Sequence, residues 1–338
     1  MGNHVDEQYL QLLNDIINEG VWKETRSGKV LSVFDKTMRF NLQDGLPVLT
    51  TKKVYLKGII YELLWFLRGD TNIKYLVDNN VHIWDDDAYR FYLNKTEWIK
   101  QNEGYKQLSK DEFISFIKNN NVNQEKIYDD FRFGDLGEVY GKQWRNYGVS
   151  NKDQIADIIN KLKTNPNDRR MVLTGWNADV LDRIALPACH MFAVFYTKPL
   201  TYDDKKSLQY NKSLKESELA LTNISSYKLS CSFTCRSQDV FLGTPFNITS
   251  YALLTCMVAQ CANMIPDELI WHGMDCHIYE GHMDAVKEEL SRDPCRYDLP
   301  ILRLNEKITN IDNFTYEDIN VINYESYQSI KAPLSVGI

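Results

Sequence analysis

The stretch CRSQDVFLGTPFNITSYALL, Cys235 to Leu254, joins a predicted strand at 227–240 to a long apolar helix at 246–264. A second stretch, LKGIIYELLWFL at 56–67, is apolar on nearly all sides, which indicates a buried helix. Strands and apolar helices mixed in this way predict an α+β fold. The other predicted elements are helices at 5–20, 151–164 and 280–292, strands at 170–176, 190–197 and 271–279, and a strand–turn–strand at 29–50 that breaks at Asp44-Gly45.

The 338 residues show no repeat and no Gly/Ser-rich linker, so we predict a single domain over 1–338. Two polar stretches interrupt it. Residues 90–133 are rich in Lys and Asn and weakly helical, which predicts a small inserted subdomain. Residues 199–226 predict a surface insertion in a β-hairpin, because they are rich in Lys, Ser and Asn and lie between two predicted strands.

Composition limits the classes of function. A net charge of −7 argues against a general nucleic-acid-binding protein, which would present a basic face. The N-terminus is too polar for a secretory signal, and no uncharged run reaches the ~18 apolar residues that a membrane helix needs. Seven cysteines without a disulfide framework indicate a reducing compartment. We therefore expect a cytoplasmic protein with neither a membrane nor a nucleic-acid partner.

The run RIALPACHMF, Arg183 to Phe192, places Cys189 beside His190. A thiolate is a strong nucleophile only where its surroundings keep it deprotonated, and Arg236 is the candidate for that role. Most lone buried cysteines are inert, so this motif is weak by itself. Support comes from other polar residues in unusual settings, namely Glu62 inside the apolar helix, the pair Arg169-Arg170 and the pair Arg236-Ser237.

A metal site is not expected. His272, His277 and His282 recur every five residues, a spacing that puts them on one face of neither a helix nor a strand. The cysteines lack the CxxC spacing of a zinc site. The sequence also contains no glycine-rich dinucleotide motif, no phosphate-binding P-loop and no GxSxG.

Eight motifs occur in order along the chain: DGLPVLTTKK, YELLWFLRGDTNI, GDLGEVYGKQWR, DRRMVLTGWN, ALPACH, RSQDVFLGTPFNITSYALL, DCHIY and IKAPL. Together they resemble the thymidylate synthase family, over essentially the whole chain outside the two insertions. The resemblance implies a catalytic domain over 1–338 with a large, twisted mixed β-sheet that backs a homodimer interface and is flanked by helices. Residues 90–133 resemble the longer small helical subdomain found in part of the family.

The resemblance also implies a reaction. The family transfers one carbon from 5,10-methylenetetrahydrofolate to C5 of dUMP through a covalent adduct, here between Cys189 and C6, and forms dTMP and dihydrofolate. Asn247 resembles the residue that reads the pyrimidine edge; the branch acting on dCMP carries Asp there. The catalytic residues that the resemblance implies are Cys189, Glu62, Tyr140, His190, Asn247 and Arg236. The dUMP ligands that it implies are Arg26, Arg169, Arg170, Arg236, Ser237, Asp239, Asn247, His277 and Tyr279, of which Arg169 and Arg170 act across the homodimer. The folate pocket that it implies contains Trp84, Asp239, Gly243 and Phe246.

Several departures from the family pattern leave a second reaction open. Asp87 stands where Trp or Asn is common, Val194 replaces Gln, and Met274 replaces Gly. The arginine loop after Arg26 is one residue shorter, and the tail at 332–338 is about two residues longer. A looser closure would let water replace hydride and give 5-hydroxymethyl-dUMP, the product of a dUMP hydroxymethylase. A more remote alternative is an inactive relative that only binds a nucleotide or RNA.

Overall fold

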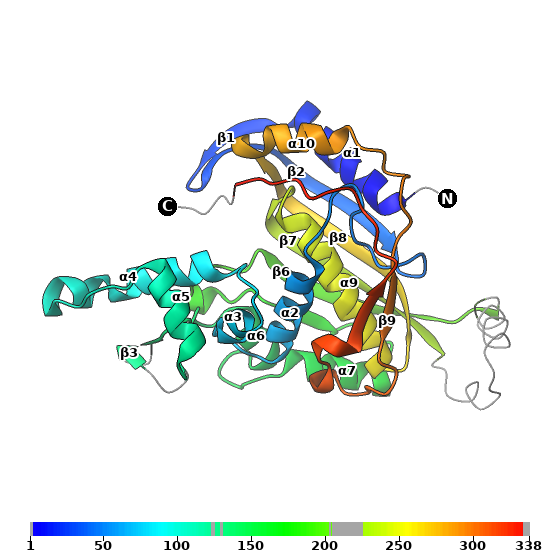
Figure 1. Ribbon diagram of the computed structural model, residues 1–338. Helices are drawn as coiled ribbons and strands as arrows, with labels where there is room; N and C mark the ends of the chain where they lie inside the picture. The colour runs from blue at the N-terminus through cyan, green and yellow to red at the C-terminus, as the bar shows by residue number, and fades with distance from the viewer. Residues whose placement is uncertain (1–2, 123–125, 129–130, 203, 205–225, 334–338) are drawn as a thin grey trace.

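The structure is a computed structural model (Figure 1). It describes residues 3–122, 126–128, 131–202, 204 and 226–333. The insertion predicted at 199–226 therefore lies almost entirely outside the described residues. Within them, no helix combines the length and the apolar character needed to cross a membrane.

A six-stranded sheet runs through the molecule in the order β1-β2-β8-β7-β6-β5. β7 and β8 are parallel, because α9 connects them as a crossover, and the other neighbours are antiparallel. The α+β class and the large mixed sheet are therefore confirmed. The strands of this sheet are β1 Val21–Thr25, β2 Gly28–Asn41, β5 Val172–Thr174, β6 His190–Pro199, β7 Tyr227–Asp239 and β8 Ile265–Tyr279. Short strands outside this sheet are β3 Lys126–Tyr128, β4 Phe131–Arg132, β9 Ile301–Leu304 and β10 Ile319–Ile322.

Helices pack against the sheet. α9 contacts β7, β8 and α2, and fourteen of its residues are buried, which explains why its sequence is apolar all round. α1 begins at the N-cap Asn3, whose side chain accepts from the first amides of the helix, and it packs on β2. The helices are α1 His4–Glu19, α2 Leu56–Leu67, α3 Lys74–Asp78, α4 Asp85–Glu103, α5 Lys110–Asn119, α6 Tyr140–Arg145, α7 Gln154–Thr164, α9 Gly243–Cys261 and α10 Met283–Leu290.

The prediction of a second strand after the turn at Asp44-Gly45 is wrong. The first half is β2, but residues 46–50 form no strand, although they are buried. Pro47 has no N–H to donate to a strand ladder, and its carbonyl accepts from Thr249 of α9. The amide of Leu46 donates to Pro300, so the partners of this segment come from distant loops rather than from a neighbouring strand.

Two peripheral regions frame the site described below. α4, α5 and β3 extend from one side of the molecule, and aromatic contacts join α4 to α5, such as the stacked rings of Tyr92 and Phe113 with centroids 4.8 Å apart (Figure 1). On the other side, residues 323–333 form an extended segment that we call the C-terminal strap. The amide of Tyr327 in this strap donates to Thr50, and the hydroxyl of Tyr324 donates to Leu49.

Candidate active site

Cys189 lies immediately before β6, beside the end of β7. Its amide donates to the hydroxyl of Tyr140 at 2.7 Å, and its carbonyl accepts from the amide of Arg236 at 2.8 Å. The side chain is partly buried. The backbone around the thiol is thus fixed by contacts with α6 and β7.

Arg236 holds the loop that carries the thiol. Its Nε donates to the carbonyl of Ala188 at 2.9 Å, its terminal nitrogen donates to Pro187 at 3.0 Å, and its guanidinium lies over the Trp176 ring. Burial raises the pKa of the Cys189 thiol and the positive charge of Arg236 lowers it, with burial the larger effect. The role of Arg236 in favouring the thiolate stays a prediction, because in this protein alone the net shift of the Cys189 pKa is upward.

Glu62 projects from α2, where the sequence indicated an unusual carboxylate. Burial raises its pKa to about 7, and one hydrogen bond opposes this shift, from the indole Nε1 of Trp84 to Oε1 at 2.7 Å. No cation contributes to the shift of this carboxyl group. Glu62 can therefore both give and accept a proton near neutral pH.

His190 is buried and stacks on Tyr140, with ring centroids 3.9 Å apart and planes 10° apart. Its Nδ1 lies 2.9 Å from the hydroxyl of Tyr251. Burial lowers the pKa of His190 to about 3, so its imidazole is neutral at physiological pH. His190 thus joins Tyr140, which binds the Cys189 amide, to α9.

The first turns of α9 carry a second group of predicted residues. Asn247 donates from Nδ2 to the Oε1 of Gln238 at 3.1 Å. Asp239 accepts the amides of Phe241 and Leu242, both at 3.0 Å, through its Oδ1. A Cβ on Gly243 would lie 2.7 Å from Gln238, so a larger residue there would displace the amide that orients Asn247.

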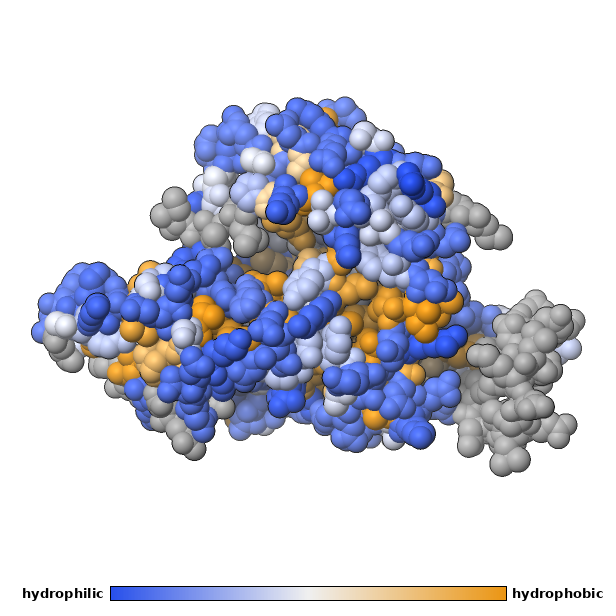
Figure 2. All heavy atoms as spheres, in the orientation of Figure 1, coloured by the Kyte–Doolittle hydropathy of each residue, from blue (hydrophilic) through white to orange (hydrophobic). Residues whose placement is uncertain are grey.

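The β1–β2 turn and β8 carry further predicted residues. Arg26 and Ser27 form the two-residue turn between Thr25 and Gly28, and Arg26 is exposed. A hydrogen bond with Ser27 lowers the pKa of Tyr279, while burial raises it by more. Figure 2 shows a hollow in the surface between the part of the molecule that contains β1 and α10 and the part that contains α4. The predicted residues of the β1–β2 turn belong to the first of these parts, and those at the start of α4 belong to the second.

The edges of two strands hold the remaining predicted residues. Ser237 on β7 is in register with Asp275 on β8, and Asp275 lies two residues before His277. The ring of His277 meets the ring of Tyr279 at right angles, with centroids 5.2 Å apart. Trp84 is buried next to Glu62, and Phe246 is partly buried.

Arg169 and Arg170 are not brought to this group. Both are exposed, and Arg170 pairs with Asp168. The β5–β6 register, extended by two residues from Val172 opposite Val194, puts Arg170 near the level of Tyr196. That level is seven residues along β6 from Cys189, or about 20 Å at the rise of an extended chain.

Two residues of the group were missed by sequence reasoning. Tyr251 contacts His190, and Gln238 contacts Asn247. Tyr251 carries a hydroxyl within the apolar α9, which is the same signal that pointed to Glu62 within α2. Gln238 lies inside the quoted motif but carried no chemical signal of its own.

Metal ligation has no support in this group. Among the described residues, no three His, Cys, Asp or Glu side chains come close enough together to hold a metal ion.

A cavity of about 1070 Å³ lies away from the candidate active site, between residues 42–46, 256–266 and 301–309, and none of the predicted site residues lines it.

Comparison with known proteins shows the family to which the chain belongs. The sequence model of the family described as thymidylate synthase matches residues 7–336. The chain belongs to the thymidylate synthase family. It is 42% identical over 331 residues to a thymidylate synthase of Mycoplasma mobile, covering 98% of this chain and 100% of that protein. It is 38% identical over 334 residues to a thymidylate synthase of Coxiella burnetii, again covering 98% of this chain and 100% of the relative. The match to the thymidylate synthase family thus runs through every motif quoted above.

Proposed function

We propose that the protein is a methyltransferase of the thymidylate synthase type, which converts dUMP to dTMP with 5,10-methylenetetrahydrofolate as co-substrate. The observation that carries this proposal is the grouping of Cys189, Tyr140 and His190, together with Glu62, in a chain that matches the family from end to end. The co-substrate, when bound, supplies the one-carbon unit and the hydride.

Cys189 is the proposed nucleophile. Its Sγ adds to C6 of the pyrimidine and makes C5 nucleophilic, and the same bond breaks when the product leaves. Burial disfavours the thiolate in the protein alone and the charge of Arg236 opposes this effect, so we expect Arg236 to stabilise the negative charge that Sγ gains when its proton leaves.

Glu62 is the proposed centre of proton transfer. With a pKa of about 7, its carboxyl can donate a proton to the O4 of the pyrimidine and recover it, through water or directly. Tyr140, with its hydroxyl accepting from the Cys189 amide, is the proposed aid to loss of the C5 proton. Asn247, oriented by Gln238, is the proposed reader of the pyrimidine edge.

The residues of the proposed folate pocket fit a flat, hydrogen-bonding ring. Trp84 presents an indole beside Glu62, and Asp239 uses only Oδ1 for the two amides that it accepts. Its Oδ2 can accept N–H groups of a heterocycle. Gly243 and Phe246 lie on the first turn of α9, directly after the loop whose amides Asp239 accepts.

A homodimer would complete the phosphate site. Arg169 and Arg170 lie about 20 Å from Cys189 in one chain, so they could serve a phosphate only in a neighbouring copy. One face of β5 and β6 is apolar and uncovered, with Val172 43%, Phe192 39% and Tyr196 62% exposed. An apolar sheet face of this kind is typical of a subunit interface.

A complementation experiment tests the dimer. The variants Cys189→Ala and Arg170→Ala are expected to be inactive or nearly so when separate. After mixing and subunit exchange, heterodimers carry one complete site, so about a quarter of the wild-type activity is expected. Activity that stays at the sum of the two separate variants would contradict shared sites.

The hydroxymethylase alternative is less well supported. Both relatives described above are named thymidylate synthase. Asp87, the acidic residue that suggested water as the final reactant, forms an ion pair with Arg90 on the next turn of α4. Its charge is therefore partly compensated before any ligand binds.

The reaction of purified protein with dUMP and 5,10-methylenetetrahydrofolate tests the function. We expect dihydrofolate, followed by its absorbance, and a nucleotide heavier than dUMP by one CH2 unit. A nucleotide heavier by CH2O without dihydrofolate would show a hydroxymethylase. If neither dihydrofolate nor a nucleotide heavier than dUMP forms, both reactions are contradicted.

A further inference from the structure

The last described residue of the C-terminal strap meets the candidate active site at one histidine. The Nε2 atom of His282 lies 2.8 Å from the carbonyl oxygen of Pro333. Its Nδ1 lies 3.7 Å from Oδ1 of Asp239, on the opposite side of the ring. The ring is fully buried, between Phe241 and Tyr279, with centroids 5.6 and 5.4 Å away.

The direction of these contacts follows from proton positions. A carbonyl oxygen only accepts, so the Nε2 of His282 must carry the hydrogen that binds Pro333. The Nδ1 edge then faces Asp239 and has no hydrogen-bond partner among the described residues. A buried polar atom without a partner is costly unless it serves a ligand or a water, so this edge is an unusual feature.

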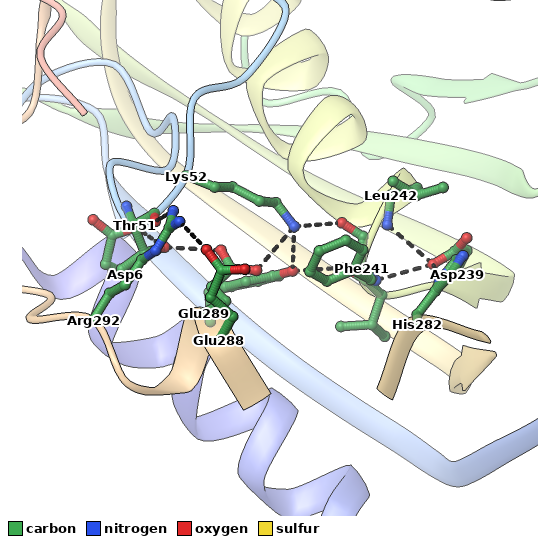
Figure 3. Close-up of polar contacts among 12 residues, drawn as sticks. Asp6, Thr51, Lys52, Asp239, Phe241, Leu242, His282, Glu288, Glu289 and Arg292 are labelled. Atoms are coloured by element: carbon green, nitrogen blue, oxygen red, sulfur yellow. Dashed lines mark hydrogen bonds and ion pairs between the residues drawn. The ribbon is translucent and has the colours of Figure 1, made fainter. Parts of the chain in front are cut away.

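Asp239 in turn sets the start of α9. Its Oδ1 accepts the amides of Phe241 and Leu242, and Leu242 is the N-cap residue of α9. The same turn is held from its other side, because the Nζ of Lys52 donates to the carbonyl of Phe241 at 2.6 Å (Figure 3). Asp239 and Lys52 therefore both hold this turn, Asp239 through the amides of the turn and Lys52 through a carbonyl.

We infer that His282 is a positioning residue that couples the seating of the C-terminal strap to the orientation of Asp239 and the first turn of α9. When the strap is seated, Pro333 fixes the ring through Nε2, and the fixed ring, whose Nδ1 lies 3.7 Å from Oδ1 of Asp239, limits by contact the positions that this carboxylate can take. The inference extends the proposed function, because Asp239, Gly243 and Phe246 are the proposed folate-binding residues.

Two substitutions separate the two edges of the ring. His282→Gln keeps an amide near the position of Nε2 and loses the Nδ1 edge. His282→Asn keeps an amide near Nδ1 and loses the contact with Pro333. His4→Gln is the control, since His4 is an exposed histidine of α1 that pairs only with Glu7 on the same helix.

Hydrogen exchange of the protein without ligands is the first measurement. In His282→Asn, we expect the exchange of amides in the strap, such as that of Tyr327, and in 239–247 to rise together by about tenfold, with the rest of the chain unchanged. His282→Gln should retain protection of the strap and lose it in 239–247. Faster exchange in the strap alone for His282→Asn would overturn the coupling, and so would a rise spread over the whole chain.

Steady-state kinetics is the second measurement. Both variants should raise the KM for 5,10-methylenetetrahydrofolate by about tenfold and the KM for dUMP by less, about threefold, because the loosened segment 239–247 also carries Asn247, the proposed reader of the pyrimidine. An unchanged KM in both variants, or equal losses of folate and dUMP binding, would contradict a positioning role. If the wild-type protein makes no product from these substrates, the proposed function fails, whereas the hydrogen-exchange result still decides whether His282 couples the two segments.

Discussion

Two buried polar clusters in this protein have opposite electrostatic designs. In the first, which we call the Lys52 cluster, Lys52, Glu289 and Asp6 join α1, α10 and the loop after residue 46 (Figure 3). In the second, the candidate active site, Glu62 and His190 are also buried or nearly so. In the Lys52 cluster, Lys52 forms an ion pair with Glu289, and Asp6 accepts hydrogen bonds from Thr50 and Thr51. In the candidate active site, neither Glu62 nor His190 has an ion-pair partner among the described residues.

The Lys52 cluster uses all of its donors. The ammonium of Lys52 donates to the hydroxyl of Tyr9, the carbonyl of Phe241 and the Oε2 of Glu289, at 3.2, 2.6 and 3.0 Å. The hydroxyl of Thr51 lies between the carboxylates of Glu289 and Asp6. Because each group needs the others to stay buried, the cluster fixes the position of three chain segments.

Glu62 and His190 in the candidate active site are buried without a charge of opposite sign. Burial moves the pKa of Glu62 up to about 7 and that of His190 down to about 3, and neither has an ion-pair partner among the described residues. Each shift disfavours the charged form, so folding costs free energy at these residues and gains proton-transfer ability. The comparison teaches that Lys52, which is buried with a carboxylate, holds three chain segments together, whereas Glu62, which is buried without a cation, keeps a pKa that suits proton transfer near neutral pH. Burial also raises the pKa of Asp6 in the Lys52 cluster to about 6, so a raised pKa does not by itself mark a site of chemistry.

The largest expected effect is that of Cys189→Ser. An alcohol is far less nucleophilic than a thiolate, so kcat should fall by at least ~10⁴-fold. The free energy of unfolding should change by less than about 1 kcal/mol, since the two side chains differ little in size. Turnover and urea denaturation of the same preparation give both numbers, and retention of a tenth of the activity would show that Cys189 is not the nucleophile.

Glu289→Ala should destabilise the Lys52 cluster by about 3–5 kcal/mol, because it leaves the ammonium of Lys52 buried without its carboxylate. The matched control is Glu288→Ala, the neighbouring residue, whose half-exposed carboxylate pairs with Arg292 and should contribute less than about 1 kcal/mol. Chemical denaturation measures both variants. Equal effects would mean that the buried pair has no special weight.

Glu62→Gln should change stability with a defined dependence on pH. The folded protein holds the proton of Glu62 up to about pH 7, and the unfolded chain only up to the ordinary value of 4.5. The stability that this group contributes is therefore complete below pH 4.5 and is lost as the pH rises through 7, by about 3 kcal/mol.

Since glutamine cannot lose a proton, Glu62→Gln should be more stable than the wild type by about 3 kcal/mol above pH 8 and equally stable at pH 4. Its turnover should fall by at least ~100-fold, because it cannot transfer protons. Denaturation curves at the two pH values test the first point. A constant difference between the proteins would show that Glu62 has an ordinary pKa.

Trp84→Phe should have the smallest effect. It removes the hydrogen bond that favours the ionised form of Glu62, so the pKa of this carboxyl should rise further above about 7, by less than about one pH unit. The pH profile of kcat/KM should shift upward by the same amount. A downward shift would mean that the indole does not bind the carboxylate.

The sequence by itself determined the elements whose pattern is local. The apolar run at 56–67 gave α2 with the predicted bounds, and the amphipathic run at 5–20 gave α1 within one residue at each end. The order of the motifs also determined the family, because each motif can be recognised from the sequence without knowing which distant residues it contacts. Glu62 was visible for the same reason: a carboxylate within an apolar helix is a local contradiction.

Only the tertiary structure decided which polar groups meet. Lys52 and Glu289 are 237 positions apart, so no pattern in the sequence links them. Residues 46–50 read as a strand, yet their hydrogen bonds go to Asp6, Thr249 and Pro300, which only the packed chain brings near. The state of charge follows the same rule: the sequence named Glu62, His190 and Cys189, but burial by the surrounding fold sets the pKa of each.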